Sequence, residues 1–575
     1  MMDVWDDPLS QDEAALIAPF VTNVDRPVFG LRNLPEVVKG ALFSRYSRSD
    51  KSLRRILLDE FIKAPEAGFE RIVSAAAATG LDQLVAIQQA EAFYERVLIG
   101  YGDDSVAELG GAHIACESVS NIAAKALEDS RIGIDPLEKS TRYVVFNRKV
   151  GGRYRYYREP SIMASPYAAR YEAALDHLFD TYTALIDPML AWVRARTPRD
   201  EATSERAYNS AARAKALDLL RGLLPMATLT NVGLYGNGRA FEYLLTKLYA
   251  SPHTEVRELA QAMQAELDQL IPSFVKRAKT ERGAQYARYI AARRDNVAAL
   301  ARQLGLLALT PSPPSQTRLK PGTGGRGGEG GEGWEGAAPM VKLVEYDPDA
   351  EAKTVAAILY PHTDLPLEQV RAYVATLTPE ERARIIAAFL GERGSRFHKP
   401  GRAFEEPYYT FDLLVDLGAY RDLHRHRILT QERQRYTVRH GYVIPEEVEA
   451  AGLAGPFREA LERAAETVEA ISADLPDAAQ YAVPLAFRIR WRIKLNLREA
   501  YHLCELRSSQ QGHPSYRAVA QEIYRQINAV HPTLAAGMTF VDLNAYPLER
   551  LASEQRIDEK LKRREQVQVA GEKRY

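Results

Sequence analysis

Apolar residues recur every three or four positions along several stretches of this chain, a period that predicts amphipathic α-helices. In the first half these stretches are residues 34–43, 80–101, 105–127, 167–194, 209–220 and 238–250. In the second half they are residues 350–359, 367–377, 446–474 and 498–527, with a further helix expected from residue 379, where proline precedes two glutamates. Strands are predicted at residues 340–346, which alternate apolar and polar side chains, and at residues 408–415, which are rich in aromatic and β-branched side chains.

Part of this pattern occurs twice, once in each half of the chain. Three short segments of the first half have similar counterparts in the second half, in the same order. Residues 237–239 resemble 496–498, residues 256–260 resemble 516–520, and residues 271–272 resemble 531–532. Upstream, Ser140-Thr141-Arg142-Tyr143 corresponds to Arg433-Gln434-Arg435-Tyr436. A repeat of this length predicts two copies of one domain, not a solenoid of short units. The first copy is the longer one, so extra helix is expected between residues 160 and 210.

Proline and glycine separate the two copies. Residues 310–339 carry almost no apolar side chains, so this stretch lacks the means to form a core and is interpreted as a flexible linker. The predicted organisation is an N-terminal segment at 1–25, a first domain at 26–305, a linker at 306–339, a second domain at 340–545 and a charged helical tail at 546–575. The tail is interpreted as a solvated or clasping helix.

Charge and cysteine content narrow the class of protein. The 75 basic and 76 acidic residues nearly cancel, which predicts neither a nucleic-acid nor a membrane partner. Two cysteines, Cys116 and Cys504, exclude a disulfide framework and suit a reducing compartment. No run of about 18 apolar residues occurs, and residues 1–13 do not resemble a secretory signal. The expectation is a soluble cytoplasmic protein.

The segment Arg425-His426-Arg427 carries the most informative chemistry. Taken alone, it is typical of a solvated basic turn. Its surroundings favour another interpretation, because Glu405 precedes it and Asn496, Arg498 and Arg507 follow it. This order and spacing resemble the flavin-dependent thymidylate synthases, in which an Arg-His-Arg signature follows a Glu-containing strand and precedes an Asn-x-Arg helix that ends in Leu-Arg.

The first half resembles the same family through different segments. Residues 102–108 are similar to its Gly-His-x-Ser-Val-x-Glu segment, and residues 117–120 to its Glu-Gly-Val-Ser turn. Residues 138–143 match Glu-x-Ser-x-Arg-Tyr, and residues 221–225 match Arg-x-x-Leu-Pro. The resemblance covers most of both halves. It implies an α+β fold, with two tandem domains that each pack helices on a small mixed sheet.

Each half departs from the family where the other half keeps its pattern. Residues 128–130 stand where the first copy would have Arg-His-Arg, and Leu248 replaces its late arginine. In the second copy, Arg433 replaces the serine of the signature and Gln480 replaces the Leu-Pro arginine. Because family sites are shared between subunits, the residues that remain would add up to one complete site. The alternative is that both halves are simply eroded.

The resemblance implies a role for each group retained. Arg507 is the expected catalytic residue, since a permanent cation beside the uracil ring would stabilise charge that develops there. The expected dUMP-binding residues are Glu138, Lys139, Ser140, Thr141, Arg142, Arg221, Asp422, Arg425 and Arg507. The expected FAD-binding residues are Ser105, Glu108, Arg425, His426, Arg427, Asn496, Arg498 and His502. Arginine forks suit phosphate because they bind two of its oxygens in one plane.

The function expected from the resemblance is FAD-dependent conversion of dUMP to dTMP. Methylenetetrahydrofolate would supply the carbon, and flavin reduced by NADPH would supply the hydride. A homodimer of the fused chain would reproduce the family's four-domain assembly, and no metal site is expected. Asp422 and Glu406, which replace Gln and His of the family, add negative charge and favour an alternative, a non-catalytic nucleotide-binding or assembly protein. A related flavoenzyme that acts on another pyrimidine nucleotide is a third possibility.

Overall fold

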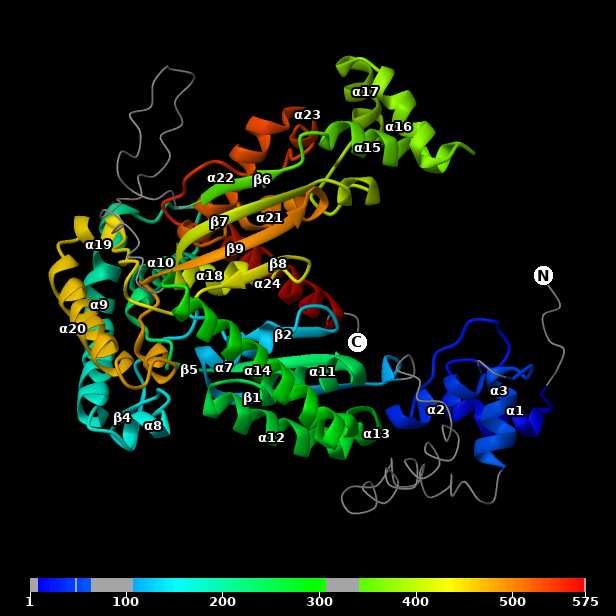
Figure 1. Cartoon of the computed structure of the whole chain (residues 1–575), viewed down its shortest axis with the longest axis horizontal. Coiled ribbons are helices and arrows are strands. Elements are labelled where there is room, and N and C mark those ends of the chain that lie inside the picture. Colours follow the sequence, from blue (N-terminus) through cyan, green and yellow to red (C-terminus); the bar gives the residue numbers. More distant parts are fainter. Residues whose placement is uncertain (1–8, 47–48, 64–106, 307–340, 573–575) are drawn as a thin grey trace. The chain divides into compact units, whose positions relative to one another are not determined.

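The computed structural model describes residues 9–46, 49–63, 107–306 and 341–572 of the chain (Figure 1). The helix expected at residues 80–101, nearly all of the expected linker and the candidate residue Ser105 lie outside these ranges. No helix among the described residues combines the length and the apolar character needed to cross a lipid bilayer.

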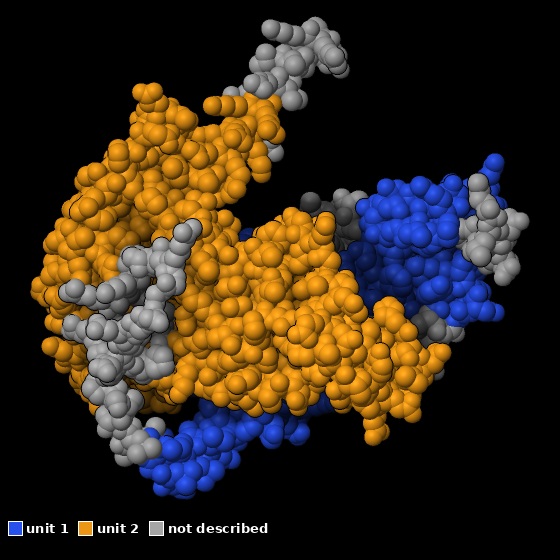
Figure 2. Space-filling model, turned by 90° about the horizontal axis from the view of Figure 1, so that it is seen from above, with its two compact units in different colours: residues 1–119, 123–138, 230–308 blue, residues 120–122, 139–229, 309–575 orange. Residues whose placement is uncertain are grey.

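The chain forms two compact units, which Figure 2 distinguishes by colour. The first unit contains residues 1–119, 123–138 and 230–308, and the second contains residues 120–122, 139–229 and 309–575. The units therefore differ from the two halves of the repeat. A large part of the first copy, residues 139–229, folds together with the whole second copy.

The first unit packs helices on a three-stranded sheet of order β1-β5-β2. Strands β2 (Ile134–Glu138) and β5 (Leu229–Asn237) are antiparallel, with Ile134 opposite Gly236. Its main helices are α1 (Gln11–Ile17), α2 (Glu36–Tyr46), α3 (Leu53–Ile56), α11 (Gly238–Tyr249), α12 (Thr254–Leu270), α13 (Pro272–Val275) and α14 (Glu281–Gln303). Asn237 begins α11 because its side chain accepts the Ala240 N–H at 2.8 Å, as a helix N-cap does.

The prediction of one helix over residues 105–127 is wrong. Residues Gly111–Ser120 form strand β1, and a short helix, α7 (Asn121–Glu128), follows. In β1 the side chains of Ala112, Ile114 and Cys116 are buried and alternate with more exposed ones. A period of two is that of a strand, and the apolar side chains of α7 extended it into an apparent helical pattern.

The second unit is built on a four-stranded sheet of order β6-β7-β9-β8 (Figure 1). Its strands are β6 (Val341–Tyr346), β7 (Tyr408–Asp416), β9 (Arg488–Asn496) and β8 (Thr430–Arg433), and all of their pairings are antiparallel. The α+β class is confirmed, with antiparallel strands here where a mixed sheet was expected. Leu413 lies opposite Trp491 at the centre of the core, and both side chains are fully buried.

Helices α18 (Leu417–Leu423), α21 (Leu497–Arg507) and α22 (Pro514–Val530) lie against this sheet (Figure 1). The other helices of this unit are α8 (Pro160–Met163), α9 (Ala168–Arg196), α10 (Glu205–Leu220), α15 (Ala350–Leu359), α16 (Leu367–Thr376), α17 (Pro379–Leu390), α19 (Glu446–Ala450), α20 (Ala454–Ser472), α23 (Pro532–Ala535) and α24 (Leu551–Glu572). Two stretches expected to be continuous are each divided. Gly452, at a φ of 74°, separates α19 from α20, and residues 508–513 separate α21 from α22.

Corresponding segments of the two copies pair with each other inside this unit. The Met226 N–H donates to the Val483 carbonyl at 2.9 Å, and the Leu485 N–H donates to the Leu224 carbonyl at 2.9 Å. Pro225 and Pro484, which hold the same place in the repeat, are directly opposite each other. These backbone bonds join the Leu-Pro element of the first copy to its counterpart in the second. The long helices α9 and α20 also pack together.

The C-terminal helix α24 packs along α10. At its start, the Lys215 ammonium contacts the Glu549 carboxylate at 2.8 Å, and both side chains are buried. Farther along, Arg206 of α10 donates to Glu554 at 3.1 Å and pairs with Asp558. Of the two interpretations of the tail, the contacts support the clasping one.

We expect Lys215→Ala to lower the free energy of unfolding by about 3 kcal/mol, because it leaves the buried Glu549 carboxylate without its cation. Chemical denaturation measures the change. Lys353→Ala is the control, since its ion pair with Asp347 is partly exposed and worth less than about 1 kcal/mol. Equal effects of the two substitutions would contradict a buried ion pair at the start of the clasp.

Candidate functional site

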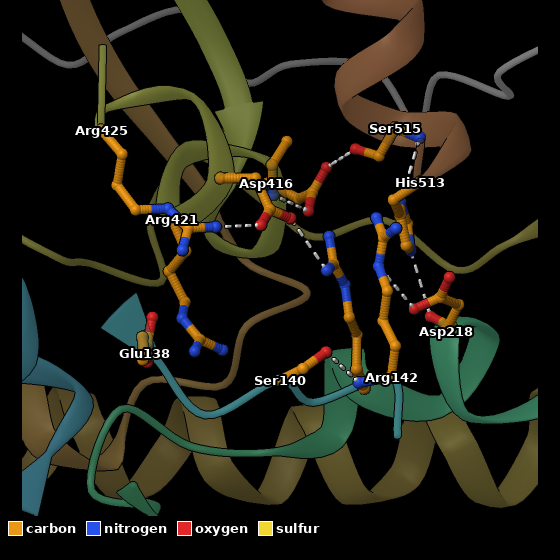
Figure 3. Close-up of polar contacts among 12 residues, drawn as sticks. Glu138, Ser140, Arg142, Asp218, Asp416, Arg421, Arg425, His513 and Ser515 are labelled. Carbon is orange, nitrogen blue, oxygen red and sulfur yellow. Dashed lines mark hydrogen bonds and ion pairs between the residues drawn. The ribbon is translucent and has the colours of Figure 1, made fainter. Parts of the chain in front are cut away.

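Four arginines gather in the second unit with two carboxylates between them. Arg142, Arg425 and Asp218 are labelled in Figure 3. We refer to these residues as the arginine cluster: Arg142, Arg221, Arg425 and Arg507, with Asp218 and Asp422. The first copy supplies two of the arginines and the second copy supplies the other two. Two retained arginines of each half therefore lie together, as the composite-site hypothesis requires.

Helix ends place most of these side chains. Arg221 directly follows α10, Arg507 is the last residue of α21, and Arg425 comes just after α18. A helix carries partial negative charge at its C-terminus, so cations are favoured there. Asp416 begins α18 by accepting the Ala419 N–H at 2.8 Å, and it also accepts the hydroxyl of Ser515 (Figure 3).

Asp422 joins Arg221 of the first copy to Arg425 of the second. Nη1 of Arg221 lies 3.1 Å from Oδ2 of Asp422, and Nη2 of Arg425 lies 2.8 Å from Oδ1. Burial acts to raise the pKa of Asp422, but the guanidinium groups around it outweigh burial and hold that pKa well below its usual range. The carboxylate is ionised at neutral pH and neutralises part of the cluster.

Gly418 leaves room for the Arg221 guanidinium. A Cβ at this position would lie 3.0 Å from Nε and 3.0 Å from Nη2 of Arg221, and 2.9 Å from Oδ1 of Asp416. Any larger side chain would displace the arginine. The glycine thus allows the first turn of α18 to approach a residue of the other copy closely.

Arg142 is held from three sides. Its Nε lies 3.2 Å from Oδ1 of Asp218, its Nη1 donates to the Gln511 carbonyl at 3.0 Å, and its guanidinium carbon lies 5.2 Å from the centre of the Tyr516 ring. Arg507 contacts the same ring, at 5.7 Å. The cation expected at the phosphate and the cation expected at the uracil therefore flank one tyrosine.

Two buried nitrogens of the cluster are donors of the kind that bind an oxyanion. Nη2 of Arg142 and Nη2 of Arg221 are inaccessible to solvent and have no hydrogen-bond acceptor in the described part of the chain. A buried donor left unbonded costs about 1–3 kcal/mol. The two side chains are only 7% and 5% exposed. An oxyanion bound here would satisfy both donors.

A chain of polar groups fixes Arg507. Its Nε donates to Nε2 of His426 at 2.8 Å, and Nδ1 of His426 lies 2.6 Å from Oε1 of Glu499. Because arginine is only a donor, Nε2 must accept, and the proton of the neutral ring lies on Nδ1. Burial and the neighbouring arginines hold the pKa of His426 well below its usual range, so the ring stays neutral.

Glu499 and His502 extend this chain along α21. Burial raises the pKa of Glu499 to about 7, and burial lowers the pKa of His502 to about 4. The His502 and His426 rings are 5.3 Å apart. At neutral pH the two imidazoles are uncharged, and Glu499 is divided between its ionised and protonated forms.

His513 connects the two copies at the other side of the cluster (Figure 3). Its Nδ1 accepts the Ser515 N–H at 3.1 Å, so the neutral ring carries its proton on Nε2 and donates to the Asp218 carbonyl at 3.2 Å. Burial lowers the pKa of His513 well below its usual range. The ring acts as a neutral link between α10 and the start of α22.

The expected substrate-binding residues belong to both units. Arg142, Arg221, Asp422, Arg425 and Arg507 form the arginine cluster. Ser140 supports it, since its Oγ accepts the Arg142 N–H at 3.3 Å. The neighbouring Lys139 is half-buried and Thr141 is buried. Glu138 belongs to the first unit, where its carboxylate accepts from the buried Lys125 at 3.0 Å.

The expected cofactor-binding residues are also divided. His426 and His502 lie beside the cluster, and Arg427 is exposed. The Asn496 side chain caps α21 by accepting the Glu499 N–H at 2.8 Å, and Arg498 pairs with Glu405 at 2.6 Å. Glu108 belongs to the first unit and pairs with Arg239 on its surface.

Sequence reasoning missed several residues of the site. Asp218, Glu499 and Tyr516 contact the arginines or the histidine of the signature. Asp416 accepts from the hydroxyl of Ser515, and His513 contacts the Asp218 carbonyl. A signal existed for Asp218, which precedes Arg221 at the end of a predicted helix. Glu499, His513 and Tyr516 lie within the stretch predicted as one helix at residues 498–527, and Asp416 is the last residue of strand β7.

The raised pKa of Glu499 predicts a pH-dependent stability. Between pH 4.5 and about 7 the Glu499 carboxyl is deprotonated in the unfolded chain while it still holds its proton in the folded chain. The contribution of Glu499 to the free energy of unfolding therefore falls as pH rises. The loss approaches about 3 kcal/mol. We expect Glu499→Gln to remove that loss, with the Gln oxygen still accepting from His426. Chemical denaturation at pH 5 and pH 8 tests this, with exposed Glu466→Gln as control. An unchanged pH dependence in Glu499→Gln would refute it.

Comparison with known proteins gives the family. The model of the thymidylate synthase complementing protein family matches residues 62–273 and 342–533. A UPF0159 protein of Chlamydia muridarum is 42% identical over 547 residues, which cover 95% of this chain and 98% of that protein. A UPF0159 protein of Thermoplasma acidophilum is 32% identical over 545 residues, 90% of this chain and 98% of that protein.

More distant similarities cover about one third of the chain. A flavin-dependent thymidylate synthase of Geobacter sulfurreducens is 26% identical over 204 residues, which cover 34% of this chain and 84% of that protein. The crystal structure of a UMP/dUMP methylase PolB from Streptomyces cacaoi bound with 5-Br dUMP matches with a TM-score of 0.29 and 16% identity, covering 36% of this chain and 97% of that one. The two family matches confirm the predicted duplication, and this chain belongs to the thymidylate synthase complementing protein family as a tandem of two family domains.

Proposed function

We propose that this protein is an FAD-dependent thymidylate synthase that converts dUMP to dTMP, with its site at the arginine cluster of the second unit. The observation that carries this proposal is the pair of buried, unbonded Nη2 atoms of Arg142 and Arg221 among the described residues. Family membership and the similarity to a flavin-dependent thymidylate synthase support it.

The phosphate of dUMP would bind between the guanidinium groups of Arg142 and Arg221. Each offers an Nη2 donor that the described protein atoms leave unused. The hydroxyl of Ser140 lies at the same loop. Two arginine forks and a hydroxyl are the donors that phosphate oxygens prefer. A dianion would also offset the repulsion among the clustered cations.

Arg507 would face the uracil ring. Its bond to His426 uses one of five N–H groups and fixes the plane of the guanidinium. The neutral His426 acts here as a positioning residue, because it accepts from Arg507 and donates to Glu499. A fixed cation costs little reorganisation when negative charge develops on the ring, which is the basis of electrostatic catalysis.

FAD would bind beside this chain of histidines. The side chains fit such a group in part: His502 is half-buried and neutral, and Arg427 is an exposed cation. Arg498 is committed to Glu405 and the Pro400 carbonyl and would shape the site indirectly. Bound flavin supplies the hydride, after reduction by NADPH, and methylenetetrahydrofolate is the proposed carbon donor. We also propose a cytoplasmic homodimer.

One observation favours a second function. The Asp422 carboxylate already bridges Arg221 and Arg425, so a phosphate must compete with it. Such competition weakens binding of a dianion. A non-catalytic protein that binds a uridine nucleotide or serves assembly is therefore the alternative proposal, and turnover distinguishes the two.

We expect purified protein to absorb in the flavin region and to release tritium from 5-tritiated dUMP when NADPH and methylenetetrahydrofolate are present. Arg142→Ala and Arg221→Ala should each reduce kcat/KM by about 100-fold or more, since each removes a charged contact to the substrate. Arg170→Ala is the matched control, because this arginine lies on the exposed surface of α9.

Tritium release separates the candidates. Protein that binds dUMP and flavin but releases no tritium would support the non-catalytic alternative. Protein that releases tritium equally well after Arg142→Ala and Arg221→Ala would place the reaction elsewhere in the chain.

A further inference from the structure

The C-terminal segment brings another arginine to the edge of the cluster. We propose that Arg550 is a further substrate-binding residue that contacts the phosphate of the nucleotide, and that helix α24 exists to hold it there. The inference rests on the proposed function, because it assigns Arg550 to the same site. Neither the composition of the tail nor the family resemblance indicated such a role.

The backbone at Arg550 is fixed from both sides. Glu549, immediately before it, is buried and accepts from Lys215 of α10 at 2.8 Å. After it, Glu554 and Asp558 of α24 pair with Arg206, and Gln555 donates to the Thr203 hydroxyl at 2.8 Å. Asp218 lies in the last turn of α10, and Arg221 directly follows this helix. The helix that holds the tail is therefore also the helix that supplies the cluster.

The Arg550 side chain reaches the loop that carries Arg142. Its Nη1 donates to the hydroxyl of Tyr143, and its guanidinium carbon lies 4.6 Å from the centre of that ring. Its Nε is buried and has no hydrogen-bond acceptor in the portion of the chain that the structure describes. Arg550 thus resembles Arg142 and Arg221, which also keep an unused buried donor.

Electrostatics point to an anion beside Arg550. Burial and repulsion by the Arg142 cation lower the pKa of Arg550 to about 10, against a weaker effect of Glu554. Two guanidinium groups held near each other raise the free energy of the folded chain. A phosphate near both cations would reverse the sign of this interaction, because attraction to a dianion exceeds the repulsion between single charges.

A purely structural role for Arg550 is the competing explanation. In that case the side chain would only fasten the start of α24 to Tyr143 through its hydrogen bond and ring contact. The two roles need different properties of the residue. Fastening requires a donor of suitable length, whereas phosphate binding requires positive charge.

The test compares Arg550→Gln and Arg550→Lys in the full-length protein. Gln keeps a donor for Tyr143 and loses the charge, while Lys keeps the charge. Arg556→Ala is the matched control, since this arginine of α24 is exposed and contacts Ser553. Calorimetry would measure Kd for dUMP, inorganic phosphate and deoxyuridine, and thermal unfolding would check that each variant folds.

We expect Arg550→Gln to raise Kd for dUMP and for phosphate by about tenfold, the effect of losing one charged contact, and to leave Kd for deoxyuridine unchanged. Arg550→Lys should stay within about threefold of the unmodified protein, and Arg556→Ala should bind all three probes normally. The Gln variant should also show a weaker dependence of dUMP binding on salt.

Other outcomes overturn the inference. If Arg550→Gln binds dUMP and phosphate with unchanged affinity, Arg550 only fastens the start of α24. The same conclusion follows if this variant binds dUMP and deoxyuridine more weakly by the same factor. If the unmodified protein binds phosphate but not dUMP, the proposed function fails, and the phosphate affinity of Arg550→Gln still decides the role of Arg550. Binding of neither anion by the unmodified protein would refute both proposals.

Discussion

Repulsion among buried guanidinium groups is the constraint on which the second unit depends. Arg142, Arg221, Arg425 and Arg507 remain together because carboxylates lie between them, with Asp218 against Arg142 and Asp422 between Arg221 and Arg425. Taking these charges out of water costs several kcal/mol for each ion unless attraction and hydrogen bonds compensate. The compensation is incomplete, since two donors stay unbonded within the described residues. A site that is neutralised only in part is suited to an anionic ligand.

The junction between the copies makes this cluster possible. Residues 139–229 carry Arg142, Asp218 and Arg221, and they fold with the second copy. Backbone hydrogen bonds between residues 222–227 and 481–486 fix their position, with Pro225 opposite Pro484. Two separate chains would need to associate to form the same contacts. Fusion makes that association intramolecular. The entropy cost of bringing the two copies together is therefore part of the entropy cost of folding.

The sequence predicted the strands and helices in which the spacing of apolar residues is regular. The prediction failed where a strand pattern runs directly into a helix pattern. Helices at residues 350–359 and 238–250 were found because their apolar period is regular. Strand β1 was missed because its period of two runs directly into the apolar face of α7. Strand β9 was missed although its apolar side chains alternate with arginines and lysine, a pattern that indicates a half-buried strand.

Motifs identified the arginines of the site but not the residues that orient them. Arg142, Arg221 and Arg507 followed from the family pattern, whereas Asp218 and Tyr516 are set by contacts between segments far apart in the chain. Such pairing depends on the junction between copies, which no local pattern encodes. Glu138 stays a predicted substrate-binding residue, and its carboxylate pairs with Lys125 of its own copy.

At positions where a copy no longer has the family residue, the residue present now stabilises the fold. This argues against simple erosion. Gln480 stands where the second copy would have the counterpart of Arg221, and its side chain accepts the Tyr436 N–H at 3.1 Å. Arg433 replaces the serine of the signature and lies over the Tyr436 ring at 4.2 Å. Both residues hold the loop that corresponds to Ser140–Tyr143.

The first copy shows the same exchange. Glu128, at the position of the missing Arg-His-Arg, is buried and pairs with Lys125, which also binds Glu138. Unselected loss would leave buried polar groups without partners, and each would destabilise the fold by about 1–3 kcal/mol. Here each of these residues contacts a group of its own copy. The substitutions therefore remove one set of site groups and stabilise the scaffold that holds the other set in place.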